Sequence, residues 1–198
     1  MSENKVHKTE DRRVKRTKKI LKECLFSLLE EKSIDEITVK ELTEAADVNR
    51  STFYFYYKDI NDMMIQIQDS IFEVFKKNVV EQQSSFATVE DFEHYIYRFL
   101  VFCKEYENIC KFVISNDPNN NLAKKVKKTM FEHIPDSTKV FSVDDPKYYI
   151  TIFGLSAMWE TVIQWMYDGM NVCPERMAKF MAMSYFYGGR TVLESDNI

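Results

Sequence analysis

Residues 38–57 have the sequence TVKELTEAADVNRSTFYFYY, and the interpretation of the whole chain begins with this stretch. Thr38 is followed three residues later by Glu41, the T-x-x-E pattern of a capping box that starts a helix. Apolar positions carry that helix only to about Ala46, and Asn49 can cap a second short helix. Two short helices joined by about three residues cannot lie antiparallel, so the second projects its N-terminal half. The stretch therefore predicts a helix-turn-helix.

The projecting half of the second helix carries small hydrogen-bonding side chains around one arginine. Arg50 can donate two hydrogen bonds to O6 and N7 of a guanine, and the hydroxyls of Ser51 and Thr52 can reach bases or phosphates. Phe53 and Tyr57, four residues apart, are expected to face inwards, which leaves other aromatics of this run facing outwards. Such a helix fits the major groove of DNA, which is about 12 Å wide.

Charge is distributed unevenly along the chain. The net charge is −4, yet residues 1–22 hold nine Lys and Arg against three Asp and Glu, a local charge of +6. The acidic excess lies downstream. A basic N-terminal segment attached to an acidic body is typical of a DNA-binding protein with a separate regulatory part.

At the same residues the sequence resembles the TetR family of bacterial regulators. Residues 37–64, ITVKELTEAADVNRSTFYFYYKDINDMM, follow the family pattern T-V-x-x-I-A-x-x-A-G-V-S-x-G-T-x-Y-x-x-F, and the resemblance covers roughly residues 10–75. It implies an Ω-shaped homodimer. In each chain the first three helices bind DNA, the fourth links them to the rest of the chain, and the remaining helices form the ligand-binding and dimerisation domain. It also implies eight residues in contact with DNA: Thr38, Asn49, Arg50, Ser51, Thr52, Tyr54, Tyr56 and Lys58.

The sequence departs from the family pattern at four positions. Ser33, Asp47 and Ser51 stand where glycine is usual, and Ile60 stands where many members have a phosphate-binding lysine. Asp47 would have to adopt a left-handed backbone conformation, which Asp tolerates better than most residues. These departures are expected to affect the affinity for DNA rather than the formation of a helix-turn-helix.

The pattern of apolar positions, caps and breaks predicts an all-α protein of about nine helices. Only four glycines and four prolines occur, which favours long helices over a sheet. We expect a DNA-binding domain at 1–58, a linking helix and boundary at 59–85, and a regulatory and dimerisation domain at 86–198. The expected helices span about 10–31, 38–46, 49–56, 59–81, 88–105, 108–115, 122–133, 146–168 and 174–187. Thr88 is expected to cap the fifth, Pro146 and Pro174 to begin the last two, and residues 116–121 and Pro135 to lie in loops.

The C-terminal half is rich in aromatic residues and methionines, which either line a pocket for a small apolar or aromatic effector or form an ordinary core. The pocket candidates are Tyr95, Phe99, Phe102, Phe112, Phe131, Tyr149, Phe153 and Trp159. The last two long helices carry apolar stripes with small residues, which suit either a symmetric four-helix dimer interface or packing within one chain. The interface candidates are Ile150, Gly154, Ala157, Met158, Thr161, Trp165, Met177, Met181, Ser184 and Tyr185.

Several functional classes are disfavoured. The few glycines allow no G-x-G-x-x-G motif and no P-loop, no nucleophile-plus-base pattern is visible, and we expect no metal or cofactor.

The four cysteines lack C-x-x-C spacing; they are expected to be buried and reduced, with thiol sensing as an alternative. They are Cys24, Cys103, Cys110 and Cys173. Without an apolar leader or an 18-residue apolar run, a cytoplasmic protein is expected.

The leading hypothesis is a homodimeric, ligand-responsive DNA-binding regulator, usually a repressor, that acts on a palindromic operator. A coactivator or adaptor of the same fold, acting through a protein partner without a small molecule, is the first alternative. An enzyme of an unrecognised helical class is the second.

Overall fold

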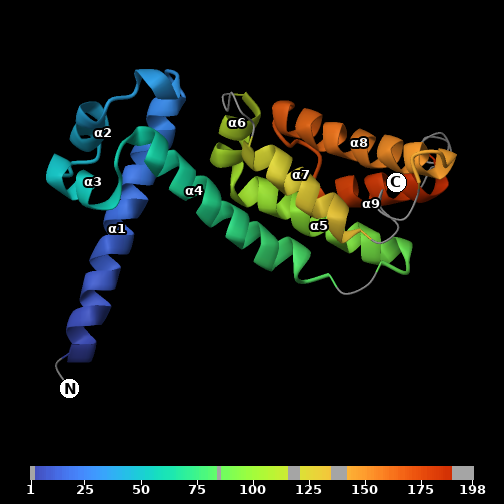
Figure 1. Cartoon of the computed structure of the whole chain (residues 1–198), viewed down its shortest axis with the longest axis horizontal. Helices are drawn as coiled ribbons and strands as arrows, with labels where there is room; N and C mark the ends of the chain where they lie inside the picture. The colour runs from blue at the N-terminus through green and yellow to red at the C-terminus, as the bar shows by residue number, and fades with distance from the viewer. Residues whose placement is uncertain (1–2, 84–85, 116–120, 135–141, 189–198) are drawn as a thin grey trace. The chain divides into compact units, whose positions relative to one another are not determined.

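The computed structural model describes residues 3–83, 86–115, 121–134 and 142–188, with the backbone alone at 3–11, 114–115 and 121. Throughout these ranges the ordered elements are helices, as the sequence predicts (Figure 1). They are α1 (Glu3–Leu29), η1 (Ile34–Glu36), α2 (Val39–Ala45), α3 (Arg50–Tyr56), α4 (Ile60–Phe75), η2 (Lys76–Val80), α5 (Val89–Glu105), α6 (Glu107–Ser115), α7 (Asn121–His133), α8 (Pro146–Tyr167) and α9 (Pro174–Tyr187).

The chain forms two compact units, residues 1–70 and residues 71–198. The division falls within α4, inside the segment 59–85 that the sequence assigns to a link. α4 therefore contributes its first part to one unit and its last turns to the other.

The first unit holds α1, α2, α3 and most of α4. α2 packs against both α1 and α3. The centre of the unit consists of side chains that are completely buried: Leu21, Leu25, Leu42, Phe53 and Met63. Because they come from all four helices, the short α2 and α3 are held by tertiary packing, which supplies most helix stability in proteins.

The second unit is built around α5, which packs along α9 and also contacts η2 and α6, while α6 contacts α7 and α8. Aromatic rings fill its interior. Phe75 is completely buried, with its ring centroid 6.0 Å from that of Phe99 and 5.6 Å from that of Phe102. Phe92 of α5 stacks on Tyr185 of α9 with the centroids 4.9 Å apart.

Most helix starts follow the predicted caps. The Thr38, Asn49 and Thr88 side chains each accept a backbone N–H from the first turn of α2, α3 and α5 respectively. Asp145 caps α8 in the same way, and Pro146 and Pro174 begin α8 and α9 as predicted.

The capping box predicted at Thr38 and Glu41 is only half formed. The Glu41 N–H donates to Thr38 Oγ1 at 3.2 Å, but the Glu41 carboxylate forms an ion pair with Lys32 instead of accepting the Thr38 N–H. A complete reciprocal pair occurs at α5, where Thr88 and Asp91 bond each other's backbone N–H. The sequence pattern alone did not reveal the competing lysine, which lies nine residues before Glu41.

Three element boundaries differ from prediction. α1 begins at Glu3 rather than near residue 10, since residues 3–10 include no Pro or Gly and their Lys and Glu residues are good helix formers. The helix predicted to reach residue 81 changes to a π-helix at Lys76–Val80. The short η1 helix was not predicted. Of the predicted loops, residues 116–120 and 135–141 lie outside the described residues.

Phe53 and Phe55 offer a matched test of this packing, because both lie on α3 and their exposed fractions are 0% and 80%. We expect Phe53→Ala to lower the free energy of unfolding by about 3–5 kcal/mol, through lost burial and a residual cavity. Phe55→Ala should change it by no more than about 0.5 kcal/mol. Urea denaturation measures both; equal losses in the two variants would contradict the packing of α3.

Candidate nucleic-acid interface and effector cavity

The turn between α2 and α3 sets the direction of α3. Asp47 has φ +50°, so the left-handed conformation predicted at this position is confirmed. The Val48 N–H donates to the Thr43 carbonyl at 3.0 Å, which closes the turn. The chain therefore changes direction within three residues, Ala46 to Val48, immediately before the Asn49 cap of α3.

The first turn of α3 is held by Asn49. Its side-chain oxygen accepts both the backbone N–H and the hydroxyl of Ser51, each at 2.9 Å. The hydroxyl of Ser51 is thus engaged in the cap. The amide NH2 of Asn49 takes no part in these two bonds and remains a donor for a base or phosphate.

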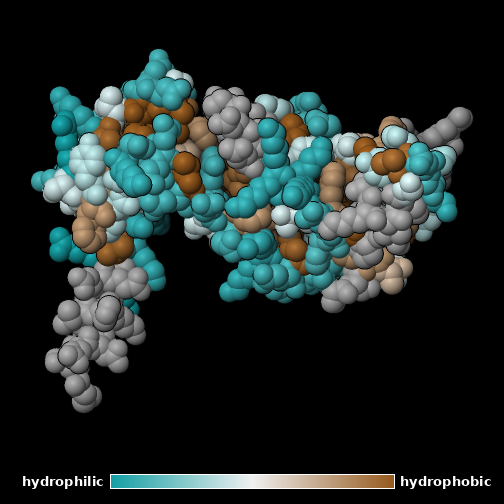
Figure 2. Space-filling view, in the orientation of Figure 1, coloured by the Kyte–Doolittle hydropathy of each residue, from teal (hydrophilic) through white to brown (hydrophobic). Residues whose placement is uncertain are grey.

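α3 presents two different faces. Phe53 is completely buried and Tyr57, at its C-terminal cap, is 5% exposed, as predicted for the inward face. Arg50 and Ser51 are exposed, and Tyr54 is 58% exposed. The surface over α2 and α3 is mainly hydrophilic (Figure 2). An exposed arginine among hydroxyls and phenols is a suitable donor set for DNA bases and phosphates.

The eight predicted DNA-contacting residues all lie on α2, α3 or the turn into α4. Thr38, Asn49, Arg50, Ser51, Tyr54 and Lys58 are exposed, while Thr52 and Tyr56 are half-buried. At the start of α4 the Lys58 N–H donates to Asp62 and the Asp62 N–H donates to Asp59, at 2.9 and 2.7 Å. These two hydrogen bonds hold the backbone in place beside the exposed Lys58 side chain.

Two features of this surface were not predicted. Phe55 is 80% exposed, the most exposed of the large apolar side chains described here. Lys18 of α1 places its ammonium 5.4 Å from the ring centroids of both Tyr56 and Tyr57. The Tyr54–Phe55–Tyr56 run indicated that some aromatics face outwards, but the approach of Lys18 is a through-space contact that no sequence pattern carries.

The basic segment of residues 1–22 is helical from Glu3 onwards. Its exposed cations include Arg12, Arg13, Lys15, Arg16 and Lys19. Lys22 is half-buried, and desolvation by burial lowers its pKa. The side chains of Lys5 and Lys8 lie outside the described residues.

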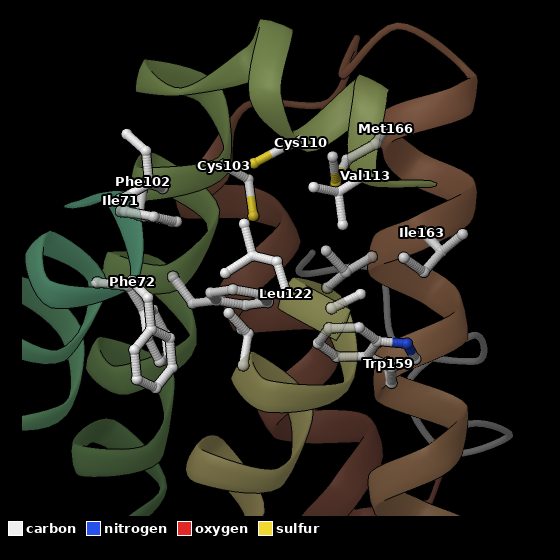
Figure 3. A pocket seen from close by; sticks show the side chains of 15 residues that line it. Ile71, Phe72, Phe102, Cys103, Cys110, Val113, Leu122, Trp159, Ile163 and Met166 are labelled. Atoms are coloured by element: carbon white, nitrogen blue, oxygen red, sulfur yellow. The ribbon is translucent and has the colours of Figure 1, made fainter. Parts of the chain in front are cut away.

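The second unit encloses two adjoining apolar cavities. The first measures about 500 Å³ including its open mouth, and its wall draws on α4 to α8 without a charged side chain (Figure 3). The second measures about 370 Å³ by the same definition. Phe99, Trp159 and Val162 line both, and the Phe99 and Trp159 rings stack with centroids 6.2 Å apart. This stack therefore separates the two cavities.

Five of the eight predicted pocket residues line these cavities: Tyr95, Phe99, Phe102, Phe131 and Trp159. Phe112 is buried but lines neither. Tyr149 and Phe153 correct the prediction, because they are 60% and 75% exposed on α8 and face away from the interior. Phe72, Cys103 and Cys110, which were not predicted, also line the first cavity.

Comparison with known proteins identifies the family. A model of bacterial regulatory proteins of the tetR family matches residues 26–67, and a TetR model described as a transcriptional regulator C-terminal region matches residues 90–185. Together they cover most of the chain. The chain belongs to the TetR family. The resemblance inferred from residues 37–64 is confirmed, and this TetR-family protein is a transcriptional regulator.

Individual relatives are distant. Over 63 residues the chain is 36% identical to the uncharacterized HTH-type transcriptional regulator YxbF of Bacillus subtilis (strain 168), a match covering 28% of this chain and 17% of that protein. A TetR transcriptional regulator from Streptococcus agalactiae 2603V superposes with TM-score 0.61 at 21% identity, covering 90% of this chain and 98% of that one. The fatty acid degradation regulator FadR from Bacillus halodurans superposes with TM-score 0.64 at 14% identity, covering 88% and 96%. These structures establish the shared TetR fold.

The predicted interface residues of this TetR regulator are divided between the interior and the surface. Trp165 and Met181 are each 4% exposed, and the Trp165 indole N–H donates to the Val172 carbonyl at 2.9 Å. Met158 lines the second cavity and Tyr185 stacks on Phe92. Ile150 and Ala157 are exposed, while Gly154, Thr161, Met177 and Ser184 are half-buried.

The described part of this TetR chain contains no group of three or more His, Cys, Asp or Glu side chains placed to hold a metal ion. Among the same residues, no helix is long and apolar enough to cross a membrane.

Proposed function

We propose that this TetR-family regulator is a cytoplasmic, homodimeric repressor that binds a palindromic DNA operator through α3 and responds to an apolar effector. The observation that carries the proposal is the two-faced α3, with Phe53 buried and the Arg50 side of the helix exposed. A rigidly anchored helix that exposes its N-terminal half is the element that a helix-turn-helix protein inserts into the major groove.

The contacts around α3 support a division of roles. Arg50 is the candidate for reading a base, because a guanidinium can bond O6 and N7 of guanine together. Lys58, Tyr54 and the exposed cations of α1 are candidates for phosphate contacts, which position a protein without reading sequence. Phe55 is suited to apolar contact with a thymine methyl group.

The exposed face of α8 supports homodimerisation. Ile150, Phe153 and Ala157 lie three and four residues apart, so they share one side of the helix, and Ile150 and Phe153 are 68% and 75% exposed. Tyr149, 60% exposed, extends this apolar surface. Exposed contiguous apolar surface on a protomer marks a site of association, and a second copy supplies the same surface by two-fold symmetry.

The cavities support binding of a small uncharged effector. Cavities lined by aliphatic and aromatic side chains are typical small-molecule sites. α4 offers a covalent route from the cavity to α3: Ile71, Phe72 and Phe75 near its C-terminal end line the first cavity, while its N-terminus follows α3 directly. An effector that changes the position of α4 would alter the spacing of two recognition helices, which must match half-sites about 34–36 Å apart.

Arg50→Ala tests the assignment of α3. Operators are first selected in vitro from random duplex DNA at two salt concentrations, and a palindrome is expected. In a titration of the selected duplex, the variant should bind about 10-fold or more weakly, since one bidentate arginine contributes about 1–3 kcal/mol. It should also discriminate less at one base pair.

Lys111→Ala, which removes one positive charge from α6, is the matched control and should bind as the original protein does. Unchanged affinity and specificity in Arg50→Ala would contradict the recognition-helix assignment. Failure to select any DNA would favour the alternative role as an adaptor for a protein partner.

Phe153→Arg tests the dimer. We expect the unmodified protein to sediment as a dimer and the variant to dissociate about 10-fold or more readily, because charges face each other across a two-fold axis. Ile65→Arg, at a 57% exposed apolar position of α4, is the control and should remain dimeric. A monomeric unmodified protein at micromolar concentration would contradict the proposed interface.

Ala123→Phe tests the cavity, since Ala123 is buried and lines it. The uncharged fluorophore N-phenyl-1-naphthylamine should bind the unmodified protein with increased fluorescence, and filling the cavity with a phenyl ring should weaken this binding. Ala45→Phe, at an exposed position of α2, should leave binding unchanged. Equal fluorophore binding in all three proteins would exclude this cavity as the effector site.

A further inference from the structure

The turn between α5 and α6 brings two cysteines together. Cys103 and Cys110 are seven residues apart, and in an unbroken helix that separation is about 10 Å along the axis. Tyr106 leaves the helical conformation, with φ −110° and ψ 35°, so α5 and α6 are separate helices. As a result the two thiols lie close enough to interact. Figure 3 shows both sulfur atoms at the same end of the first cavity.

The surroundings of this thiol pair are apolar. Cys103 is 2% exposed and Cys110 is half-buried, and both line the first cavity. The other lining residues are aliphatic or aromatic, apart from the thioether of Met166. The two thiols are therefore the reactive groups that a ligand in this cavity meets, with room for an apolar substituent beside them.

The electrostatics of the cavity limit which chemistry fits. The side-chain interaction with Cys110 and burial raise the pKa of Cys103 well above its ordinary value, so this thiol is protonated at neutral pH. A buried net charge without a partner would be strongly unfavourable here. A ligand that bonds to both sulfur atoms here must therefore replace both thiol protons and leave a neutral product.

We propose that Cys103 and Cys110 form a two-thiol binding site for a trivalent organoarsenical that carries an apolar group. In the reaction R–As=O + 2 R′SH → R–As(SR′)2 + H2O, two As–S bonds form and the As=O bond breaks. Both thiol protons leave in the water molecule, and arsenic stays trivalent. The adduct is neutral and its apolar group occupies the cavity. A monovalent ion such as Cu(I), held by two thiolates, would instead leave one negative charge buried.

Soft sulfur ligands suit such a thiophilic centre. Two sulfurs complete the bonding of an organoarsenical, so no third protein ligand is needed. This matches the described residues, where no cluster of three potential metal ligands occurs. The binding site does not depend on DNA binding, and only its use as an effector site rests on the proposed function.

The test uses phenylarsine oxide on the reduced full-length protein in the presence of excess monothiol. Two sulfurs on one arsenic resist competition by a monothiol, because the second bond forms within the molecule. Intact-mass spectrometry should show one phenylarsenic group per chain with loss of one water. Cys103→Ala and Cys110→Ala should each abolish the adduct. Cys24→Ala and Cys173→Ala remove cysteines that do not line the cavity and should retain it.

Circular dichroism is used to check that each variant is folded. If Cys103→Ala does not fold, the test rests on Cys110→Ala, because Cys110 is only half-buried. The proposal is overturned if no adduct forms, if Cys110→Ala retains it, or if the reduced protein instead loses two hydrogen atoms to dissolved oxygen and forms a disulfide. A 4-carboxyphenyl arsenical should bind about 10-fold or more weakly than the phenyl compound, because its carboxylate would be desolvated. Equal binding would exclude the cavity as the place of the aryl group.

An operator titration with the adduct is scored separately. Loss of operator affinity in the unmodified protein, but not in Cys110→Ala, would show that the site acts as an effector site. If the adduct forms and the protein selects no DNA, the thiol site stands and the proposed function fails.

Discussion

A helix of seven residues is not stable by itself in water, and α3 exists because Phe53 is completely buried in the first unit. The buried ring fixes the rotation of α3 about its own axis. That rotation in turn decides that Arg50, Ser51 and Tyr54 face outwards. The left-handed Asp47 and the Asn49 cap set where the helix starts, but neither could hold it without this anchor. The surface offered to DNA thus depends on one aromatic side chain that cannot touch DNA.

In the second unit, aromatic rings packed around α5 hold the helices in place. The rings of Phe75, Phe99 and Phe102 meet at centroid distances of about 6 Å or less. All three line the first cavity, and α4, the helix that follows α3, supplies Phe75 as one part of the wall. The thiol pair adds two reactive groups to this mainly apolar wall.

Local signals in the sequence predicted much of the fold. Caps at Thr38, Asn49 and Thr88 and prolines at 146 and 174 place helix starts correctly, because a cap is a contact within a few residues. Sequence patterns missed contacts between residues that are distant in the chain. Glu41 forms an ion pair with Lys32 instead of completing the predicted capping box, and Lys18 approaches the Tyr56 ring from another helix.

The sequence by itself determined the helix-turn-helix and the inward positions of Phe53 and Tyr57, since these follow from short-range spacing. Its resemblance to the family pattern determined the family and the left-handed Asp47. Only the tertiary structure decided which residues of α8 face the cavity. That helix is apolar on both sides, so helical period could not separate Tyr149 and Phe153, which are exposed, from Trp159, which lines both cavities. It also decided the pairing of Cys103 with Cys110, because a helix break at Tyr106 changes a separation that an unbroken helix would keep too large for any contact.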